Sequence, residues 1–388
     1  MKIMHVIHEL NIGGAQTLVK NYMLNFDDKN NEVVLLCFNH ENDSLYEKEL
    51  SDKGVRVIYV QDSLLFKQKN NILTKALNRY YRYMVIKRII DEQSPDIIHM
   101  HLAVNRFIKF ARPKRDTKLF YTVHSEPKAI WQTNKKNGKT EFQATKWLAN
   151  NYDMKFIVLH GKMKEEVDKL FNTNNSLILN NGIDVTSIKK SKSLNQIRME
   201  LGIPKQAFVL GHIGRFLKVK NHEFLADIFI EIAEKNNKAF LLMVGDGPEK
   251  ELTVNKLNNA KLKGRYLILA NREDVPDLLS AMDVFVFPSL YEGIPLSLIE
   301  AQIARKPCFV SDMVNEHAII SNLVTKISLK QSASVWSQAV LSYKTPKKKI
   351  VNEDDWDIKK ETKKLEQVYL DALLNRDNRY NSNYKENG

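Results

Sequence analysis

Two glutamates on either side of a tight turn are the first residues of this chain whose spacing could do chemistry. Glu292 and Glu300 lie in the stretch SLYEGIPLSLIEAQIARKP with seven residues between them. The first precedes a Gly-Ile-Pro turn, and the second lies on a predicted helix, so both could accept hydrogen bonds from the hydroxyls of one ligand, such as a ribose and a hexose. A pair of glutamates alone is usually chance, but here it follows the predicted buried strand DVFVFPS. At the start of the helix, the backbone N–H groups that could hold an anion are those of Ile294, Leu296 and Ser297.

Two cations and a glycine pair indicate that this anion is a diphosphate. Arg215 and Lys220 in GHIGRFLKVKNHEFL follow a predicted strand and precede a predicted helix, which is the ligand-binding edge of a parallel sheet. Arg offers a planar fork and Lys a point charge to phosphate oxygens. Gly13 and Gly14 in NIGGAQ expose backbone N–H groups in a similar position. The alternatives are loop cations that face only solvent and a turn that binds nothing. A full GxGxxG is absent, so a nicotinamide cofactor is not indicated.

The elements that must position these residues alternate along the chain. Apolar runs of strand length, such as EVVLLCF and AFLLMVGDG, are separated by helical patterns. Strands without polar alternation are typical of sheets buried on both faces, and helices between them indicate parallel βαβ units. The sequence therefore predicts an α/β fold of two doubly wound Rossmann-like domains. We expect an N-terminal domain at residues 1–186, a polar linker at 187–196 and a C-terminal domain at 197–355. A helical tail that packs back should follow at residues 356–376, and a disordered end at 377–388.

Composition is typical of a globular protein, with 388 residues of which 43% are hydrophobic and 27% charged. The two cysteines, Cys37 and Cys308, lie in apolar runs and indicate neither a metal site nor a disulfide framework, as is typical of a reducing cytosol. The first apolar run is too short for a signal peptide, and no run of about 18 apolar residues occurs. We expect a cytoplasmic protein that is soluble or attached only to a membrane surface.

Three segments together resemble a known family: GRF…KN, DVFVFPSLYEGIPLSLIEA and NGID at residues 181–184. They are similar to the retaining, metal-independent glycosyltransferases of family 4, among them bacterial exopolysaccharide and capsule transferases, which have two Rossmann-like domains facing a cleft (GT-B). The resemblance spans nearly the whole chain. It implies that Arg215 and Lys220 hold the diphosphate of a nucleotide-sugar donor, helped by Gly13 and Gly14.

The same resemblance implies roles for the acidic residues and a histidine. Glu300 would bind the ribose, and Glu292 the transferred sugar. His124 in YTVHSE would lie near the donor sugar and the acceptor, and its alternative is a satisfied core histidine. Two positions depart from the family pattern. Gln16 stands where many members have an acidic residue, and Ala270 replaces a usual glycine and puts the contact to the base in doubt.

By this resemblance the donor substrate is a nucleotide-sugar, with a UDP-sugar favoured, and the acceptor is lipid-linked or a glycan. We expect neither a cofactor nor a metal, since no Asp-x-Asp pair stands at a predicted strand end. Retention of configuration is implied by the resemblance alone. A sugar-nucleotide epimerase and a non-enzymatic protein that binds sugar nucleotides or nucleic acid are the alternatives. Release of free nucleoside diphosphate only when an acceptor is supplied would separate transfer from both.

The positive charge is local. The chain has a net charge of +13, and residues 66–150 hold 18 Lys and Arg against 6 Asp and Glu. Within them, ALNRYYRYMVIKRII interleaves basic and aromatic residues, which suits an anionic bilayer surface, where each cation contributes roughly 1 kcal/mol. This predicts peripheral attachment to the inner face of the cell membrane, near a lipid-linked acceptor. A solvated Lys-rich face is the alternative; no recognised nucleic-acid module is present, so no nucleic-acid partner is expected.

Overall fold

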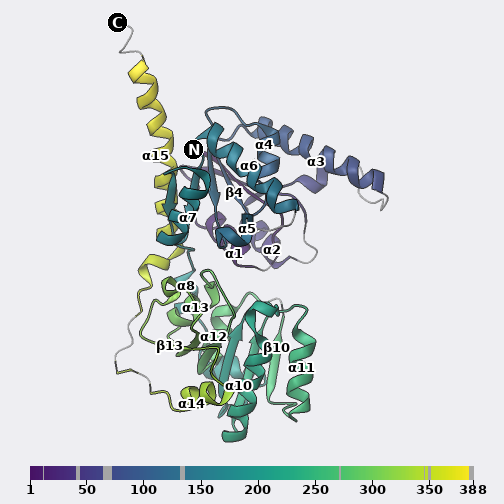
Figure 1. Ribbon diagram of the computed structural model, residues 1–388, viewed down its shortest axis with the longest axis vertical. Helices are drawn as coiled ribbons and strands as arrows, with labels where there is room; N and C mark the ends of the chain where they lie inside the picture. Colours follow the sequence, from purple (N-terminus) through teal and green to yellow (C-terminus); the bar gives the residue numbers. More distant parts are fainter. Residues whose placement is uncertain are drawn as a thin grey trace. The chain divides into compact units, whose positions relative to one another are not determined.

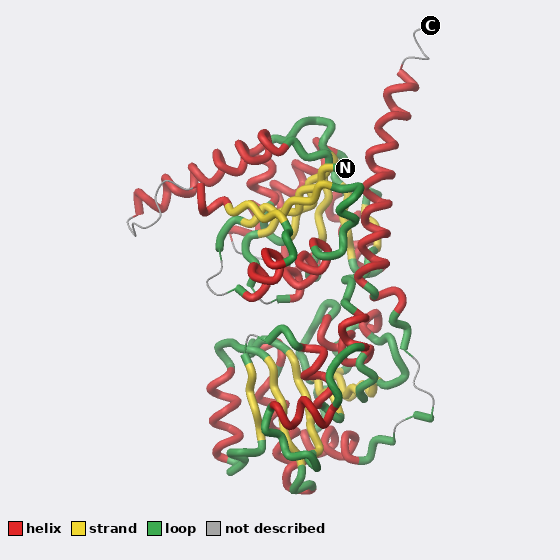
Figure 2. Tube along the Cα trace, turned by 180° about the vertical axis from the view of Figure 1, so that it is seen from behind, coloured by secondary structure: helices red, strands yellow, loops and turns green. Residues whose placement is uncertain are grey.

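The structure is a computed structural model that describes the chain except for residues 12, 41–43, 64–71, 132–135, 271, 345, 348–350 and 384–388. It has two compact units, one of Met1–Gly182 with Ile358–Gly388 and the other of Ile183–Asp357. Each unit is one sheet covered by helices (Figures 1 and 2). The recorded strand pairs in both sheets are parallel. The predicted α/β class with two doubly wound Rossmann-like domains is confirmed.

The first unit has a seven-stranded sheet in the order β3-β2-β1-β4-β5-β6-β7. Its central strands are buried because helices cover both faces, and they contain three buried histidines among apolar residues. The strands, in chain order, are β1 (Lys2–Ile7), β2 (Glu32–Cys37), β3 (Arg56–Tyr59), β4 (Ile97–His101), β5 (Lys118–Thr122), β6 (Lys155–Val158) and β7 (Ser176–Ile178).

The helices of the first unit include one from the far end of the chain. They are α1 (Gly14–Met23), α2 (Leu45–Asp52), α3 (Ile72–Gln93), α4 (Asn105–Ala111), α5 (Pro127–Trp131), α6 (Lys136–Tyr152), α7 (Gly161–Phe171) and α15 (Ile358–Asn383). The yellow helix α15 in Figure 1 packs its apolar stripe onto the same core as Ile3 and Phe120. It continues past residue 376, where we predicted the helical tail to end. Within the described residues, no helix is both long and apolar enough to cross a bilayer.

The second unit has a six-stranded sheet in the order β10-β9-β8-β11-β12-β13. Its strands are β8 (Phe208–Ile213), β9 (Ala239–Val244), β10 (Tyr266–Leu269), β11 (Val284–Phe287), β12 (Cys308–Ser311) and β13 (Val324–Ile327). Its α-helices are α8 (Val185–Lys189), α9 (Leu194–Glu200), α10 (His222–Lys235), α11 (Lys250–Asn259), α12 (Val275–Ala281), α13 (Leu296–Ile303) and α14 (Ala333–Leu341). A short 3-10 turn, Lys218–Lys220, precedes α10.

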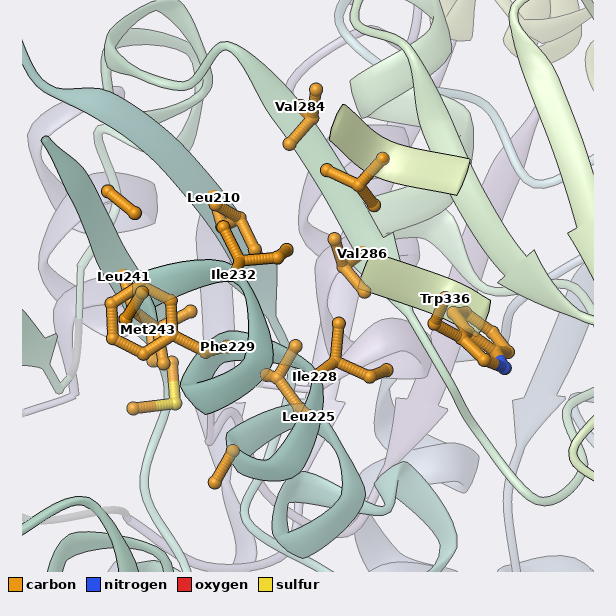
Figure 3. Close-up of a cluster of buried hydrophobic side chains, with 14 of the residues drawn as sticks. Leu210, Leu225, Ile228, Phe229, Ile232, Leu241, Met243, Val284, Val286 and Trp336 are labelled. Atoms are coloured by element: carbon orange, nitrogen blue, oxygen red, sulfur yellow. The ribbon is translucent and has the colours of Figure 1, made fainter. Parts of the chain in front are cut away.

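One apolar cluster fixes α10 on this sheet. Leu225, Ile228, Phe229 and Ile232 lie on one face of α10 and point at β8, β9 and β11, with Trp336 of α14 beside them (Figure 3). All five side chains are fully buried. The start of α10, which adjoins the loop after β8, is therefore held by a rigid core.

Both sheets change direction at their middle. The chain runs from β1 to β2 on one side while β4 lies on the other, and β8 has β9 and β11 as its two neighbours in the same way. In open parallel sheets, ligands bind at the carboxyl ends of the strands beside such a point. The loops after β1, β4, β8 and β11 are therefore where a site is expected.

Candidate functional site

The loop after β8 presents Arg215 to solvent. It is held by a second loop, Gly245–Gly247, whose Asp246 carbonyl accepts a hydrogen bond from the N–H of Phe216 at 2.9 Å. Gly245 has φ +147°, and a Cβ there would lie 2.1 Å from the carbonyl oxygen of Gly214. Only glycine allows this approach. The Gly-Asp-Gly sequence after β9 thus positions Arg215, a contribution that the sequence analysis did not identify.

Lys220 and Glu292, which were predicted separately, form an ion pair in the structure. Their Nζ and Oε1 atoms are 2.7 Å apart, and the two side chains are only 16% and 14% exposed. The Lys220 ammonium also lies 4.7 Å from the ring centroid of Phe287. They meet because β8 and β11 are neighbours: the N–H of Leu290 donates to the Val219 carbonyl at 2.8 Å and joins the two loops.

The predicted anion site at the start of α13 has the expected backbone. Pro295 is the N-cap residue, and no side chain caps the helix. Its first-turn residues are Leu296 and Ser297, preceded by the buried Ile294. Glu300 lies one turn further along α13 and is partly buried. Uncapped N–H groups at a helix N-terminus favour a negatively charged ligand.

Two buried histidines beneath Lys220 were missed by the sequence analysis. His212, on β8, shares a hydrogen bond between its Nδ1 and the Val286 carbonyl at 2.9 Å. His222 stacks on Phe216 with ring centroids 3.9 Å apart. Burial lowers the pKa of His212 to about 4 and that of His222 to about 2. Both rings are therefore neutral at physiological pH, so they add no positive charge to that of Lys220 and Arg215. In the sequence, these histidines could have been noticed only because His212 lies near the end of a predicted strand and His222 at the start of a predicted helix.

The region predicted to contact the base is only partly described. Ala270 follows β10, and residue 271 lies outside the described residues. Arg272 donates from Nε to Asp274 Oδ1 at 2.7 Å and pairs again through Nη2. The charge of Arg272 is therefore paired with that of Asp274.

The glycine turn of the first unit has an uncapped helix behind it. Gly13 is the N-cap residue of α1 in an extended conformation, without a side-chain cap, and Gly14 is the first helical residue. A Cβ at Gly13 would lie 2.6 Å from Gln16 Oε1, so Gln16, the residue that departs from the family pattern, folds over the turn. The turn has the form predicted for a phosphate contact, and that role stays a prediction.

His124 follows β5 and is partly exposed. Its Nε2 lies 3.0 Å from Nδ1 of the buried His101, at the end of β4. Burial lowers the pKa of His124 to about 4, so the ring is neutral. One nitrogen of His124 is therefore held in the core, while the residue is partly exposed at the carboxyl edge of the sheet. This arrangement shares features with both sequence-based alternatives, a residue near the donor sugar and acceptor and a satisfied core histidine.

The structure thus gathers the predicted residues into two sets. Those at the carboxyl edge of the second unit are Arg215, Lys220, Glu292, Ile294, Leu296, Ser297 and Glu300. Those at the corresponding edge of the first unit are Gly13, Gly14 and His124. The set in the second unit combines cations, uncapped N–H groups and carboxylates. The fold and this set define an α/β protein with a site suited to a phosphorylated, hydroxyl-rich ligand.

Comparison with known proteins identifies the family. Residues 194–349 match Glycosyl transferases group 1, and residues 12–187 match Glycosyltransferase Family 4. The Bacillus subtilis (strain 168) protein EpsF, named as a glycosyltransferase, is 28% identical over 87% of this chain and 86% of its own length. The UDP-Gal:alpha-D-GlcNAc-diphosphoundecaprenol alpha-1,3-galactosyltransferase of Escherichia coli is 28% identical over 74% of this chain and 79% of its own.

A solved structure shows the same fold. Anabaena HepE, crystallised with UDP and glucose, covers 98% of this chain and 100% of its own with a TM-score of 0.66 and 16% identity. The two family matches lie one in each half of the chain. The chain belongs to the group 1 glycosyltransferases of family 4, with the GT-B fold, as its motifs indicated.

The ion pair gives a first test of the diphosphate site. We expect Lys220→Met to weaken binding of UDP by about 1.5–3 kcal/mol, the contribution of a hydrogen bond to a charged group. Isothermal titration calorimetry measures it. Lys218→Met is the matched control, because Lys218 is an exposed lysine on the same 3-10 turn. Equal affinities in the two variants would place the diphosphate elsewhere.

Proposed function

We propose that this glycosyltransferase moves a hexose from a UDP-sugar to a lipid-linked or glycan acceptor during synthesis of a surface polysaccharide or glycolipid, with retention of configuration. The observation that supports it best is the Lys220–Glu292 pair beside the uncapped start of α13. This pair places a cation that could bind a phosphate next to a carboxylate that could bind sugar hydroxyls, in one partly buried site. The names of the Escherichia coli relative and the HepE structure, with UDP-Gal and UDP, favour a uridine donor.

In this proposal the diphosphate leaves with charge stabilised by fixed groups. Arg215 and Lys220 neutralise its oxygens, and the N–H groups of Ile294, Leu296 and Ser297 add oriented dipoles, which is electrostatic preorganisation. Fixed cations of this kind supply what a divalent ion supplies in other transferases, so no metal or cofactor is required. The phosphate would replace Glu292 as the partner of Lys220, and Glu292 would then accept a hydrogen bond from the transferred sugar while His124 contacts the sugar and acceptor.

The transfer itself is tested by nucleotide release. We expect purified protein to release UDP from a UDP-hexose only when a diphosphoundecaprenol-linked sugar is supplied, because the acceptor hydroxyl is the attacking group. A chelator should leave the rate unchanged. Product analysis by NMR gives the anomeric configuration. Release at the same rate without acceptor, or conversion of the donor into its epimer, would contradict the proposal.

The two glutamates should differ in their effects. Glu300→Gln should weaken UDP binding, because its proposed partner, the ribose, is part of UDP. Glu292→Gln should keep or tighten UDP binding and lower kcat, because it frees Lys220 for phosphate and removes the sugar contact. Each variant is isosteric with the wild type, so each controls for the other in calorimetry and turnover. Equal losses of UDP affinity would show that these roles are wrongly assigned.

We also propose that the first unit attaches to an anionic membrane surface, where a lipid-linked acceptor would lie. Part of the basic region faces inward: Arg82 donates to Asn39 at 2.9 Å. Other basic and apolar residues of α3, of α4 and directly after α4 are exposed, or partly exposed in the case of Lys109. We refer to Tyr80, Met84, Arg88, Lys109, Phe110 and Arg112 as the basic-aromatic group, of which Tyr80 is 62% exposed. A Tyr83–Phe110 ring contact at 4.9 Å joins the two helices.

Charge reversal tests this attachment. Changing Arg88, Lys109 and Arg112 to Glu should release the protein from vesicles of phosphatidylglycerol and phosphatidylcholine in a sedimentation assay. Binding of the wild type should fade with salt, because screening shortens to about 8 Å at physiological ionic strength. The control makes the same change of charge at the exposed Lys205, Lys238 and Lys263 of the second unit. Equal release by both triple variants, or no binding by the wild type, would contradict membrane attachment and favour the alternative of a solvated Lys-rich face.

A further inference from the structure

A chain of buried side chains links His124 to the C-terminal helix. His5 lies on β1, His99 and His101 on β4, Thr122 on β5 and Tyr369 on α15. His5 is paired in register with His99, and His101 with Thr122, so these side chains share one face of the sheet. His5, His99, His101 and Tyr369 are fully buried beneath α15.

Five consecutive hydrogen bonds make up the chain. Nε2 of His124 meets Nδ1 of His101 at 3.0 Å, and Nε2 of His101 meets Nδ1 of His5 at 2.9 Å. Nε2 of His5 lies 3.3 Å from the Tyr369 hydroxyl, which lies 2.5 Å from Nδ1 of His99. The last bond joins Nε2 of His99 to the Thr122 hydroxyl at 2.7 Å.

The chemistry of the groups allows this chain only two directions. Burial lowers the pKa of His5 to about 3 and those of His99 and His101 well below the usual value, so the rings are neutral. Burial also raises the pKa of Tyr369, which keeps its proton. A neutral imidazole has one donor and one acceptor nitrogen. Tyr369 has a single hydroxyl proton, so once it donates to either His5 or His99, it accepts from the other and every tautomer in the chain follows.

The distances select one direction. Bonds with an O–H donor are shorter than bonds with an N–H donor. We therefore take the shorter bond of Tyr369, to Nδ1 of His99, as the one in which the hydroxyl donates, and the longer one, at 3.3 Å, as donated by His5. In that direction His5 accepts from His101, and His101 accepts from Nε2–H of His124. Nδ1 of His124 then carries a lone pair, on a residue that is partly exposed.

We propose that Tyr369 is a positioning residue for His124: through His5 and His101, it holds His124 as the Nε2–H tautomer with Nδ1 ready to accept a hydrogen bond from a sugar hydroxyl. The proposal rests on the proposed function for the part that concerns the sugar. The C-terminal helix, whose sequence contains no site residue, would thereby take part in the site.

A metal ion is the competing interpretation of these histidines. Ligand atoms of His5, His99 and His101 lie within 4.8 Å of one another, close enough for an ion. However, both ring nitrogens of each of these three residues already take part in the chain. An ion would have to break bonds that satisfy every nitrogen, so the chain accounts for the cluster without one.

Nitrogen NMR of wild-type protein labelled with 15N-histidine tests the direction of the chain, and variants are needed only to assign the signals. We expect His124, His101, His5 and His99 to be Nε2–H tautomers, with the four signals assigned by single His→Gln substitutions. An Nδ1–H tautomer at His124 would overturn the proposal. Stoichiometric zinc or another metal in the purified protein would overturn it as well.

Tyr369→Phe tests the positioning role. It keeps the ring and removes the hydroxyl that sets the direction, so the His124 signal should become a mixture of tautomers. We expect kcat to fall about tenfold, the lower end of the loss seen when metal-binding histidines lose an orienting partner, with the donor KM unchanged. Tyr22→Phe is the control: it removes a buried hydroxyl from a ring 6.2 Å from His5 that is not part of the chain.

The outcomes separate the two proposals. An unchanged His124 signal and kcat in Tyr369→Phe, or equal losses in Tyr22→Phe, would overturn the positioning role. If no transfer is found with any donor, the proposed function fails, and the NMR signals still decide the direction of the chain. If Tyr369→Phe does not fold, the tautomer of His124 in the wild-type spectrum still decides the direction of the chain.

Discussion

The organisation of both units depends on burying a parallel sheet on both faces. Every strand must then be apolar over most of its length, and each connection must return across a helix. Charged side chains are then placed in the loops where strands end, while the polar residues within the strands, such as His5 and His99, must be neutral. β8 and β11, which are adjacent in the sheet but distant in sequence, end beside one another, and this brings Lys220 and Glu292 to 2.7 Å. The ion pair is thus a consequence of strand order.

The Lys220–Glu292 pair also bears on the proposed contact to a diphosphate. Two opposite charges that are less than one-fifth exposed stabilise one another, while removing a single member leaves the other uncompensated. In the proposed function a diphosphate takes the place of the carboxylate, because it offers Lys220 charge of the same sign and more acceptor atoms. The neutral His212 and His222 beside it add no further cation. The proposed donor site is therefore set to exchange one anionic partner for another.

Much of the fold and of the candidate site could be predicted from the sequence. The features that could not be predicted depend on contacts between segments that are distant in sequence. The Glu292 and Lys220 positions followed from local patterns, because each lies next to a strand or helix that its own neighbours define. The Gly245 contact could not, since it depends on two loops meeting across the sheet. The side chain of Arg82 points inward because Asn39, from another loop, accepts its hydrogen bond. The stripe on α15 predicted a packed helix, but apolar spacing alone does not say which core it joins.

The two units handle buried polar groups in different ways. The second unit places charged groups at the sheet edge and lets them neutralise one another. The first unit has uncharged imidazoles deep in its core, where a charge would be costly, and satisfies them by joining them end to end. Such a chain is directional, so in our proposal the position of the proton on His124 depends on the hydroxyl of Tyr369 further along the chain. A hydroxyl on α15 and a ring at the end of β5 are then parts of one hydrogen-bonded unit, which gives the last helix of the chain a reason to contain Tyr369 among its apolar residues.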